Sequence, residues 1–330
     1  MQPTPTLRAA RHGEEPSGAT TAALVPRAPL ELPGWVEFNE WRTGLAVRRF
    51  TSGTTGGIEA RAVMYLDRRG RIRLPPNNPY MPVVFHSARR RPSGRTEEWH
   101  RAVAPLVDEM KRRGLANRIV LPPDVEDVRP WRWRGFLVDV GYTYCLDLPL
   151  DPAFVDRGQR QGCDRAVRSG MVVDRLTDAS IVMDCLRDTQ ERKGFTLGLC
   201  PGDLQAAQDL LGTDNLRMYA CFDPAGVACS AVVVIHAPGA RAVGWLAGTR
   251  SQALPSGSGH LVWHHVFEDL AVVGAPGIDL CGANIVSTGT FKARWGARLV
   301  PSYDVRTYSL RAAARLLADW RSSRREPAHG

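Results

Sequence analysis

The order of the elements expected in the second half of the chain constrains its fold more than any other feature of the sequence. Apolar periodicity and turn signals predict a strand, a helix, a short strand, two helices, three antiparallel strands joined by tight turns, and then helix, strand, helix, strand and a last helix. The expected strands are Thr143–Leu148, Met171–Asp174, Leu216–Phe222, Val227–His236, Arg241–Leu246, Ile278–Cys281 and Leu299–Arg306, and the expected helices are Pro152–Ser169, Ala179–Lys193, Asp203–Leu211, His260–Val273, Gly289–Trp295 and Leu310–Arg321. This order predicts a mixed sheet with helices on its faces, in the α/β (α+β) class.

The first half of the chain carries weaker signals. Its expected elements are strands at Val47–Phe50, Ala60–Asp67, Val83–Phe85 and Arg118–Leu121 and a helix at Thr96–Gly114. Pro105 lies inside that helix, so we expect a kink or a break there. The Pro-, Ala-, Thr- and Gly-rich residues 1–30 predict a mobile arm.

The length of 330 residues favours two domains. We expect an N-terminal domain at 31–142, a C-terminal domain at 143–322 that begins near Thr143, and a short tail at 323–330. The sequence has no run of eighteen apolar residues and no apolar segment typical of a secretory signal. These features predict a cytoplasmic protein without stable membrane insertion.

The seven cysteines form no C-x-x-C pair. Five of them lie among apolar residues, namely Cys145, Cys185, Cys221, Cys229 and Cys281. Reduced cysteines in a core explain this distribution better than a disulfide or zinc framework.

The basic residues are almost all arginines. The formal net charge of +9 favours anionic partners such as phosphates or nucleic acid, although an arginine-rich chain is also typical of a GC-rich genome. Only Lys111, Lys193 and Lys292 are lysines. Each of these three lysines is therefore a candidate for a specific role.

The strongest motif lies near the C-terminus, in Gly282-Ala283-Asn284, then Thr290–Ala297, then the expected strand from Leu299. It resembles the C-terminal end of the FemABX group, where a strand ending in D-x-G-G precedes F-K-x-x-F-G and a strand beginning L-V-P. Further landmarks in the same order extend the resemblance over roughly residues 131–308. The resemblance implies two fused GNAT-like acyltransferase domains and an aminoacyl-tRNA-dependent transferase.

Lys292 is the candidate catalytic residue. Transfer of an aminoacyl group from an ester to an amine passes through a tetrahedral intermediate, which a nearby cation or proton donor stabilises. The resemblance assigns this role to the motif lysine, here Lys292. Spacing alone also fits a solvated lysine on an amphipathic helix. Phe291 is either a platform for substrate or a core residue.

The resemblance implies further substrate contacts at Asn284, Tyr80 and Trp245. It also places a basic helix at Arg160–Arg168, where Arg165 and Arg168 match the family and other charges are lost. Because of the lost charges, the acceptor implied by the resemblance is either the usual peptidoglycan precursor or another amine.

Ser256-Gly257-Ser258-Gly259 leads into an expected helix and is the candidate phosphate or acyl-donor site. Glycines at such a place allow backbone N–H groups to converge on a phosphate. CoA-dependent GNAT enzymes carry Gln or Arg where this chain has Leu254, which weakens a CoA interpretation. A flexible turn before a helix explains the same residues.

Three other motifs have plain explanations. Ser52–Gly57 resembles the phosphate loop of adenylating enzymes but lacks the lysine, and a hairpin loop explains it better. His260, His264 and Glu268 share a helical face, where an interhelix histidine explains them better than a metal site. Pro130–Gly135 interleaves tryptophan and arginine, which suits either single-stranded RNA or a Trp-anchored connection between domains.

The sequence therefore predicts an aminoacyltransferase that forms an amide on an amine acceptor, either a cell-wall precursor or a peptide or nucleoside natural product. Aminoacyl-tRNA is the expected co-substrate, bound through its acceptor end, with no tightly bound cofactor and no metal. The alternatives are an N-acyltransferase that uses acyl-CoA and a non-catalytic GNAT-like binding module.

Overall fold

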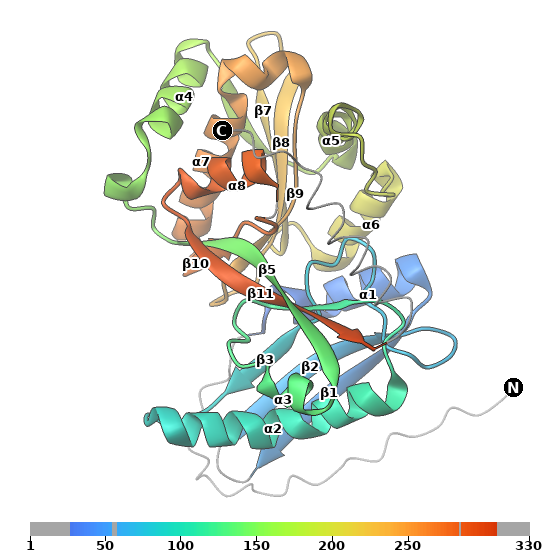
Figure 1. The fold of residues 1–330 in the computed structure, drawn as a ribbon. Coiled ribbons are helices and arrows are strands. Elements are labelled where there is room, and N and C mark those ends of the chain that lie inside the picture. The colour runs from blue at the N-terminus through green and yellow to red at the C-terminus, as the bar shows by residue number, and fades with distance from the viewer. Residues whose placement is uncertain (1–26, 55–57, 284, 309–330) are drawn as a thin grey trace, which may run out of the picture.

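The computed structural model describes residues 27–54, 58–283 and 285–308, and it has two lobes joined by a long two-stranded ribbon (Figure 1). The ribbon consists of β5 (Phe136–Asp147) and β11 (Arg298–Thr307), which pair antiparallel from Cys145↔Arg298 to Phe136↔Thr307. Because both strands run from one lobe into the other, their continuous backbone hydrogen bonds hold the two lobes together. None of the described helices is long and apolar enough to cross a membrane.

The smaller lobe is a three-stranded antiparallel sheet covered by a long helix. Its strands are β1 (Ala46–Thr54), β2 (Ile58–Leu66) and β3 (Val83–His86), and its long helix is α2 (Pro92–Arg113). The short β4 (Ile119–Leu121) and α3 (Arg129–Trp133) follow. The apolar side of α2 packs on this sheet and on Trp131, as its periodicity predicts. However, α2 continues through Pro105 as one helix, so the break that was one of the two predicted outcomes does not occur.

An eight-stranded sheet in the order β4-β11-β5-β10-β9-β8-β7-β6 runs from β4 in the smaller lobe through the ribbon into the larger lobe. Its remaining strands are β6 (Val172–Leu176), β7 (Leu216–Phe222), β8 (Ala228–Ile235), β9 (Ala242–Thr249) and β10 (Gly277–Asp279). All of its pairs are antiparallel except β9 with β10. The mixed sheet confirms the predicted fold class.

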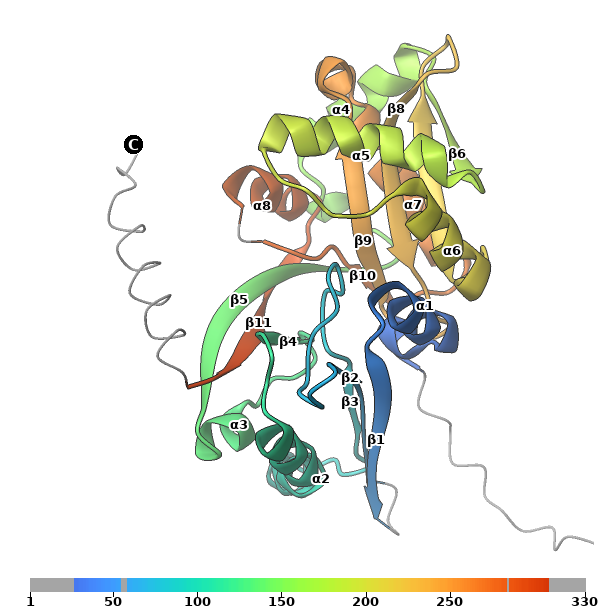
Figure 2. The same cartoon turned by 90° about the vertical axis from the view of Figure 1, so that its right-hand side faces the viewer.

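Helices cover both faces of this sheet (Figure 2). They are α4 (Arg157–Arg168) and α7 (Ser258–Val272) on one face and α5 (Ala179–Lys193) and α6 (Pro201–Leu211) on the other, with α8 (Val286–Ala293) after β10 and the short 3₁₀ helices Pro152–Phe154 and Ser251–Ser256. Met218 and Ala220 of β7 enter the core beneath α5 and α6, whereas Tyr219 and Cys221 enter the core beneath α7. Successive side chains of a strand point to opposite faces, which explains why β7 is apolar throughout.

The N-terminal helix α1 (Pro33–Thr43), which the sequence patterns do not predict, packs on α6 of the larger lobe. A short 3₁₀ turn at Pro29–Glu31 precedes it, and Leu30 is buried in the same core. Residues 1–26 of the predicted arm, and the predicted helix at Leu310–Arg321, lie outside the described residues. The predicted domain boundary at Thr143 falls within β5.

Strands β9 and β10 separate shortly after they pair. Their parallel register is limited to Ala242↔Ile278 and Val243↔Asp279, and β9 continues to Thr249 whereas β10 ends at Asp279. The chain after β10 stays with β5 instead, because Leu280 N donates to Tyr144 O at 2.8 Å and Ala283 N donates to Tyr142 O at 3.0 Å. The sheet therefore opens between β9 and β10, and α8 follows at this opening.

Candidate functional site

The candidate site is centred on Lys292, which lies in the last turn of α8. The side chain is only 9% exposed, and its Nζ donates hydrogen bonds to the backbone oxygens of Cys281 and of Gly282, the latter at 2.8 Å. Thus Lys292 is a buried cation bound to the turn that follows β10, and the solvated-lysine interpretation does not describe its position. Among the described residues it has two acceptors, which leaves one N–H of a three-donor ammonium available.

A buried carboxyl group supports this turn. Asp279, the last residue of β10, is 3% exposed and accepts hydrogen bonds at Oδ1 from Thr143 Oγ1 at 2.5 Å and from Cys281 N at 2.8 Å. Its Oδ2 is buried and has no hydrogen-bond partner within the described part of the chain. Tyr80, from the smaller lobe, is buried close to the same carboxyl group. Residues from both lobes therefore meet at the end of β10.

The charges of this cluster depend on its burial. Burial raises the pKa of the Asp279 carboxyl, and the hydrogen bonds from Thr143 and Cys281 N oppose that rise. Burial lowers the pKa of the Lys292 ammonium, which Cys281 and Asp279 oppose. Lys193, at the C-terminal end of α5, lowers the pKa of Lys292 further as a like charge. A lysine with a lowered pKa can donate a proton as well as stabilise negative charge.

Lys193 approaches α8 from the opposite side of the opening. It is exposed, and its Nζ lies 3.4 Å from Thr288 Oγ1 of α8. Two of the three lysines in the sequence thus lie near one short helix.

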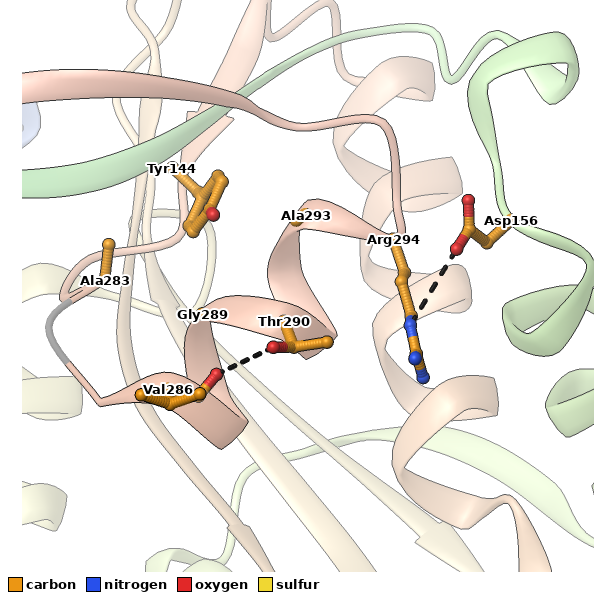
Figure 3. Close-up of a pocket in the computed structure, with 8 residues that line it drawn as sticks. All are labelled: Tyr144, Asp156, Ala283, Val286, Gly289, Thr290, Ala293 and Arg294. Atoms are coloured by element: carbon orange, nitrogen blue, oxygen red, sulfur yellow. Dashed lines mark hydrogen bonds and ion pairs between the residues drawn. The ribbon is translucent and has the colours of Figure 1, made fainter. Parts of the chain in front are cut away.

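A cavity of about 470 Å³ lies beside α8 (Figure 3). It is lined by Tyr144, Asp156, Ala283, Val286, Gly289, Thr290, Ala293 and Arg294. Arg294 Nε lies 3.8 Å from an oxygen of Asp156, and Thr290 Oγ1 donates to Val286 O at 2.9 Å. The cavity shares α8 and the turn after β10 with Lys292, but Lys292 itself is not among its lining residues. A molecule in this cavity would contact the hydroxyl groups of Tyr144 and Thr290 and the charged Asp156–Arg294 pair.

The other predicted substrate-contact residues lie at several places. Trp245 of β9 donates from Nε1 to Asn77 O at 2.8 Å and so binds the loop that carries Tyr80. Phe291 packs against the rings of His260 and Trp295, which supports the core interpretation. Asn284 lies outside the described residues.

Arg165 and Arg168 are exposed on α4, together with Arg157 and Arg160. None of these four arginines has a carboxylate within 4.0 Å among the described residues. Arg157 and Arg160 also line a second cavity of about 610 Å³ between α4 and α7, whose other walls include Trp295 and Leu261. The α4 helix therefore presents four exposed arginines and a single carboxylate, Asp164.

The predicted phosphate loop is used largely for packing. Ser256 Oγ donates to Ala253 O at 2.7 Å, and Ser258 Oγ is buried against Ser230 Oγ at 2.7 Å. Gly257 has φ +89°, and a Cβ there would lie 2.1 Å from Gly162 O of α4. A Cβ at Gly259 would lie 3.3 Å from Thr249 Oγ1. The two serine hydroxyls are therefore already engaged inside the protein.

The plain explanations of two other motifs agree with the structure. His260 lies against Gly162 of α4, as an interhelix histidine does, and His264 lies 3.5 Å from Glu268. The described residues contain no group of three or more potential metal ligands. Trp131 is fully buried in α3, as expected of a tryptophan that anchors a connection, whereas Trp133 is exposed.

Asp279, Thr143 and Cys281 are the residues of this site that sequence reasoning missed. The signal was present, because Asp279-Leu280-Cys281-Gly282 occupies the place of the family's D-x-G-G. An acidic residue at the end of an otherwise apolar strand is rarely buried without a partner. Tyr80 comes from a loop some two hundred residues earlier in the sequence, so its approach to Asp279 could not be read from local spacing.

The sequence matches no protein-family model and no curated protein. Its structure is similar to that of FemX, with a TM-score of 0.61 and 14% identity over 83% of this chain and 91% of FemX. It is also similar to the C-terminal domain of a proposed lysylphosphatidylglycerol synthetase from Agrobacterium fabrum, with a TM-score of 0.54 and 14% identity over 89% of this chain and 91% of that domain. L-PGS from Bacillus licheniformis matches with a TM-score of 0.53 and 13% identity over 89% and 97% of the two chains. The fold of this chain is therefore similar to that of FemX, as the resemblance to the FemABX group predicts.

Proposed function

We propose that this chain is an acyltransferase that moves an aminoacyl group from the acceptor end of a tRNA to an amine. The observation that carries the proposal is the buried Lys292 ammonium at the place where β9 and β10 separate, in a fold similar to that of FemX. Lys292 lies on the same helix, α8, as the cavity lined by Tyr144, Gly289 and Thr290, where an acceptor can bind.

In the proposed reaction the acceptor nitrogen attacks the ester carbonyl, and the carbonyl oxygen becomes negatively charged. Collapse of this intermediate breaks the bond to the ribose oxygen, forms the amide and releases a free ribose hydroxyl group. The nitrogen loses one proton and the ribose oxygen gains one, so no oxidant, ATP or metal is required. Lys292 stabilises the developing negative charge and donates the proton to the leaving oxygen.

The excess of exposed arginines on α4 favours a polyanionic donor. Arg165 and Arg168 present exposed positive charge that suits RNA phosphates. The Ser256–Gly259 turn offers less to CoA, because Gly257 is packed against α4 and Leu254 stands where CoA-dependent GNAT enzymes carry Gln or Arg. The cavity beside α8 is the proposed site of the acceptor, since Tyr144, Thr290 and the Asp156–Arg294 pair can orient a polar amine.

The donor is tested by supplying the protein with tRNA charged with ¹⁴C-labelled amino acids, together with the small-molecule fraction of its host cells as a source of acceptor. A parallel reaction contains acyl-CoA in place of tRNA. We expect a labelled product that resists mild base, as an amide does, and that disappears when the tRNA is first digested with ribonuclease. A base-labile product would show a hydroxyl acceptor instead. Product formation from acyl-CoA alone, or product unaffected by ribonuclease, would contradict the proposal.

A further inference from the structure

We propose that Asp279 is a positioning residue whose carboxylate holds the Cys281–Gly282 turn in the conformation that directs two carbonyl oxygens at the Lys292 ammonium. The hydrogen bonds that support this role are present in the structure, whereas its consequence for turnover rests on the proposed function. Asp279 itself touches neither the proposed donor nor the acceptor.

The Asp279 carboxylate holds the backbone of the turn by a hydrogen bond. Asp279 Oδ1 accepts the N–H of Cys281, two residues further on, as Asp side chains do in turns. Cys281 has φ +49°, and within the described residues only Asn77 shares a positive φ among residues other than glycine. Gly282 follows with φ +64°. A left-handed conformation at a residue with a side chain persists only where its surroundings enforce it. The buried Asp279 carboxylate provides that enforcement, and Thr143 fixes its orientation.

The conformation of the turn determines which oxygens accept hydrogen bonds from Lys292. Carbonyl groups of consecutive residues in an extended strand point in opposite directions, so they cannot both accept from one ammonium. The left-handed turn at Cys281 and Gly282 brings both oxygens to Lys292 Nζ. Loss of the turn would therefore free the ammonium from at least one of its two acceptors.

The charge of Asp279 also affects the pKa of Lys292. The titratable groups that act on Lys292 are Asp279 and Cys281 at the end of β10 and Lys193 on α5. Tyr80 and Cys145 lie beyond them, against Asp279 and Cys281. Burial lowers the pKa of Lys292 and Lys193 lowers it further, whereas Cys281 and the Asp279 carboxylate raise it. Asp279 thus favours the protonated form of Lys292 at a place that disfavours charge.

The small number of lysines makes a direct test practicable. Protein grown with [6-¹³C]lysine contains three labelled side chains, and Lys111→Arg and Lys193→Arg variants assign their NMR signals. Asp279→Asn keeps an acceptor oxygen for Cys281 N but removes the charge. We expect the titration midpoint of Lys292 to fall by about one pH unit or more, as loss of a nearby opposite charge does, while Lys111 and Lys193 do not shift.

Asp269→Asn is the matched control. Asp269 is a partly buried carboxylate of the same lobe that binds Arg217 and Tyr219, each at 2.5 Å, and it is not among the groups that act on Lys292. This variant should leave the Lys292 midpoint unchanged. Should Asp279→Asn fail to fold, Thr143→Val removes the hydroxyl that fixes the carboxylate and should shift the Lys292 midpoint in the same direction. An unchanged Lys292 midpoint in the folded Asp279 or Thr143 variant would overturn the proposal.

The kinetic arm separates this inference from the proposed function. In Asp279→Asn the alkaline limb of the pH–kcat profile should move to lower pH together with the NMR midpoint, and Asp279→Ala, which also loses the acceptor, should be slower than Asp279→Asn at every pH. A merely structural role would lower kcat without moving the limb. If the wild-type protein transfers no aminoacyl group, the proposed function fails, and the NMR titration still decides the role of Asp279.

Discussion

Gly257→Ala tests whether the turn before α7 is shaped by packing or by a ligand. Gly257 has φ +89°, where an alanine is strained by about 1–2 kcal/mol. A Cβ would also lie 2.1 Å from Gly162 O, a backbone atom that can move only if α4 moves. Overpacking of this kind costs about 1–3 kcal/mol. The substitution should therefore lower the free energy of unfolding by about 2–5 kcal/mol, which corresponds to a fall in Tm of roughly 3–7 °C for a chain of this length.

Gly226→Ala is the matched control, because Gly226 has φ +79° but no atom lies within 4 Å of the position that its Cβ would take. It carries the strain without the clash and should lose only about 1–2 kcal/mol. Thermal unfolding of both variants, followed by circular dichroism, gives the difference directly. Equal losses in the two variants would refute the packing argument. The glycine at 257 would then be explained by close approach of a phosphate, and the CoA alternative would regain support.

Two further predictions concern charged side chains. The double variant Arg165→Ala/Arg168→Ala should weaken binding of charged tRNA and reduce the slope of log Kd against log salt by about 1–2. The control Arg101→Ala, in the smaller lobe, should change neither. Equal slopes in the wild-type protein and both variants would exclude α4 as an RNA surface. Although burial acts to raise the pKa of Asp127, hydrogen bonds from Arg129 and His100 lower it to about 2. The stabilisation that the Asp127 carboxylate provides is therefore complete above the pKa of this group in the unfolded chain, and it is lost as the pH falls towards 2. In urea unfolding, Asp127→Asn should destabilise the protein by roughly 1–2 kcal/mol at pH 6 and hardly at pH 2. The same loss at both pH values would contradict this assignment.

Much of the fold could be predicted because its signals are local. The helix α5 begins at Ala179 and ends at Lys193, as its periodicity predicts. Strands β7 and β8 were predicted within one residue at each end, because tight turns mark their limits. The order of these elements also carried the resemblance that the structural comparison confirms.

The features that were missed depend on contacts between distant segments. Helix α1 has little amphipathic pattern. It is stabilised by the burial of Trp35 and Phe38 against α6, a contact that its local sequence pattern does not predict. A break at Pro105, one of the two predicted outcomes, does not occur, because the apolar side of α2 is packed on the small sheet along its length. The Asp279 cluster unites residues from β5, β10, α8 and the Tyr80 loop, which no spacing rule connects.

The central claim is that the Lys292 ammonium acts on the reacting carbonyl. Single-turnover transfer from charged tRNA by wild-type protein, Lys292→Met and Lys111→Met measures it most directly. Methionine keeps the length of the buried side chain, and Lys111 lies in the smaller lobe near Phe136. We predict a rate about 10²–10³-fold lower in Lys292→Met alone, the usual loss for one stabiliser of an oxyanion. A Lys292→Met rate equal to that of the wild-type protein would contradict the account.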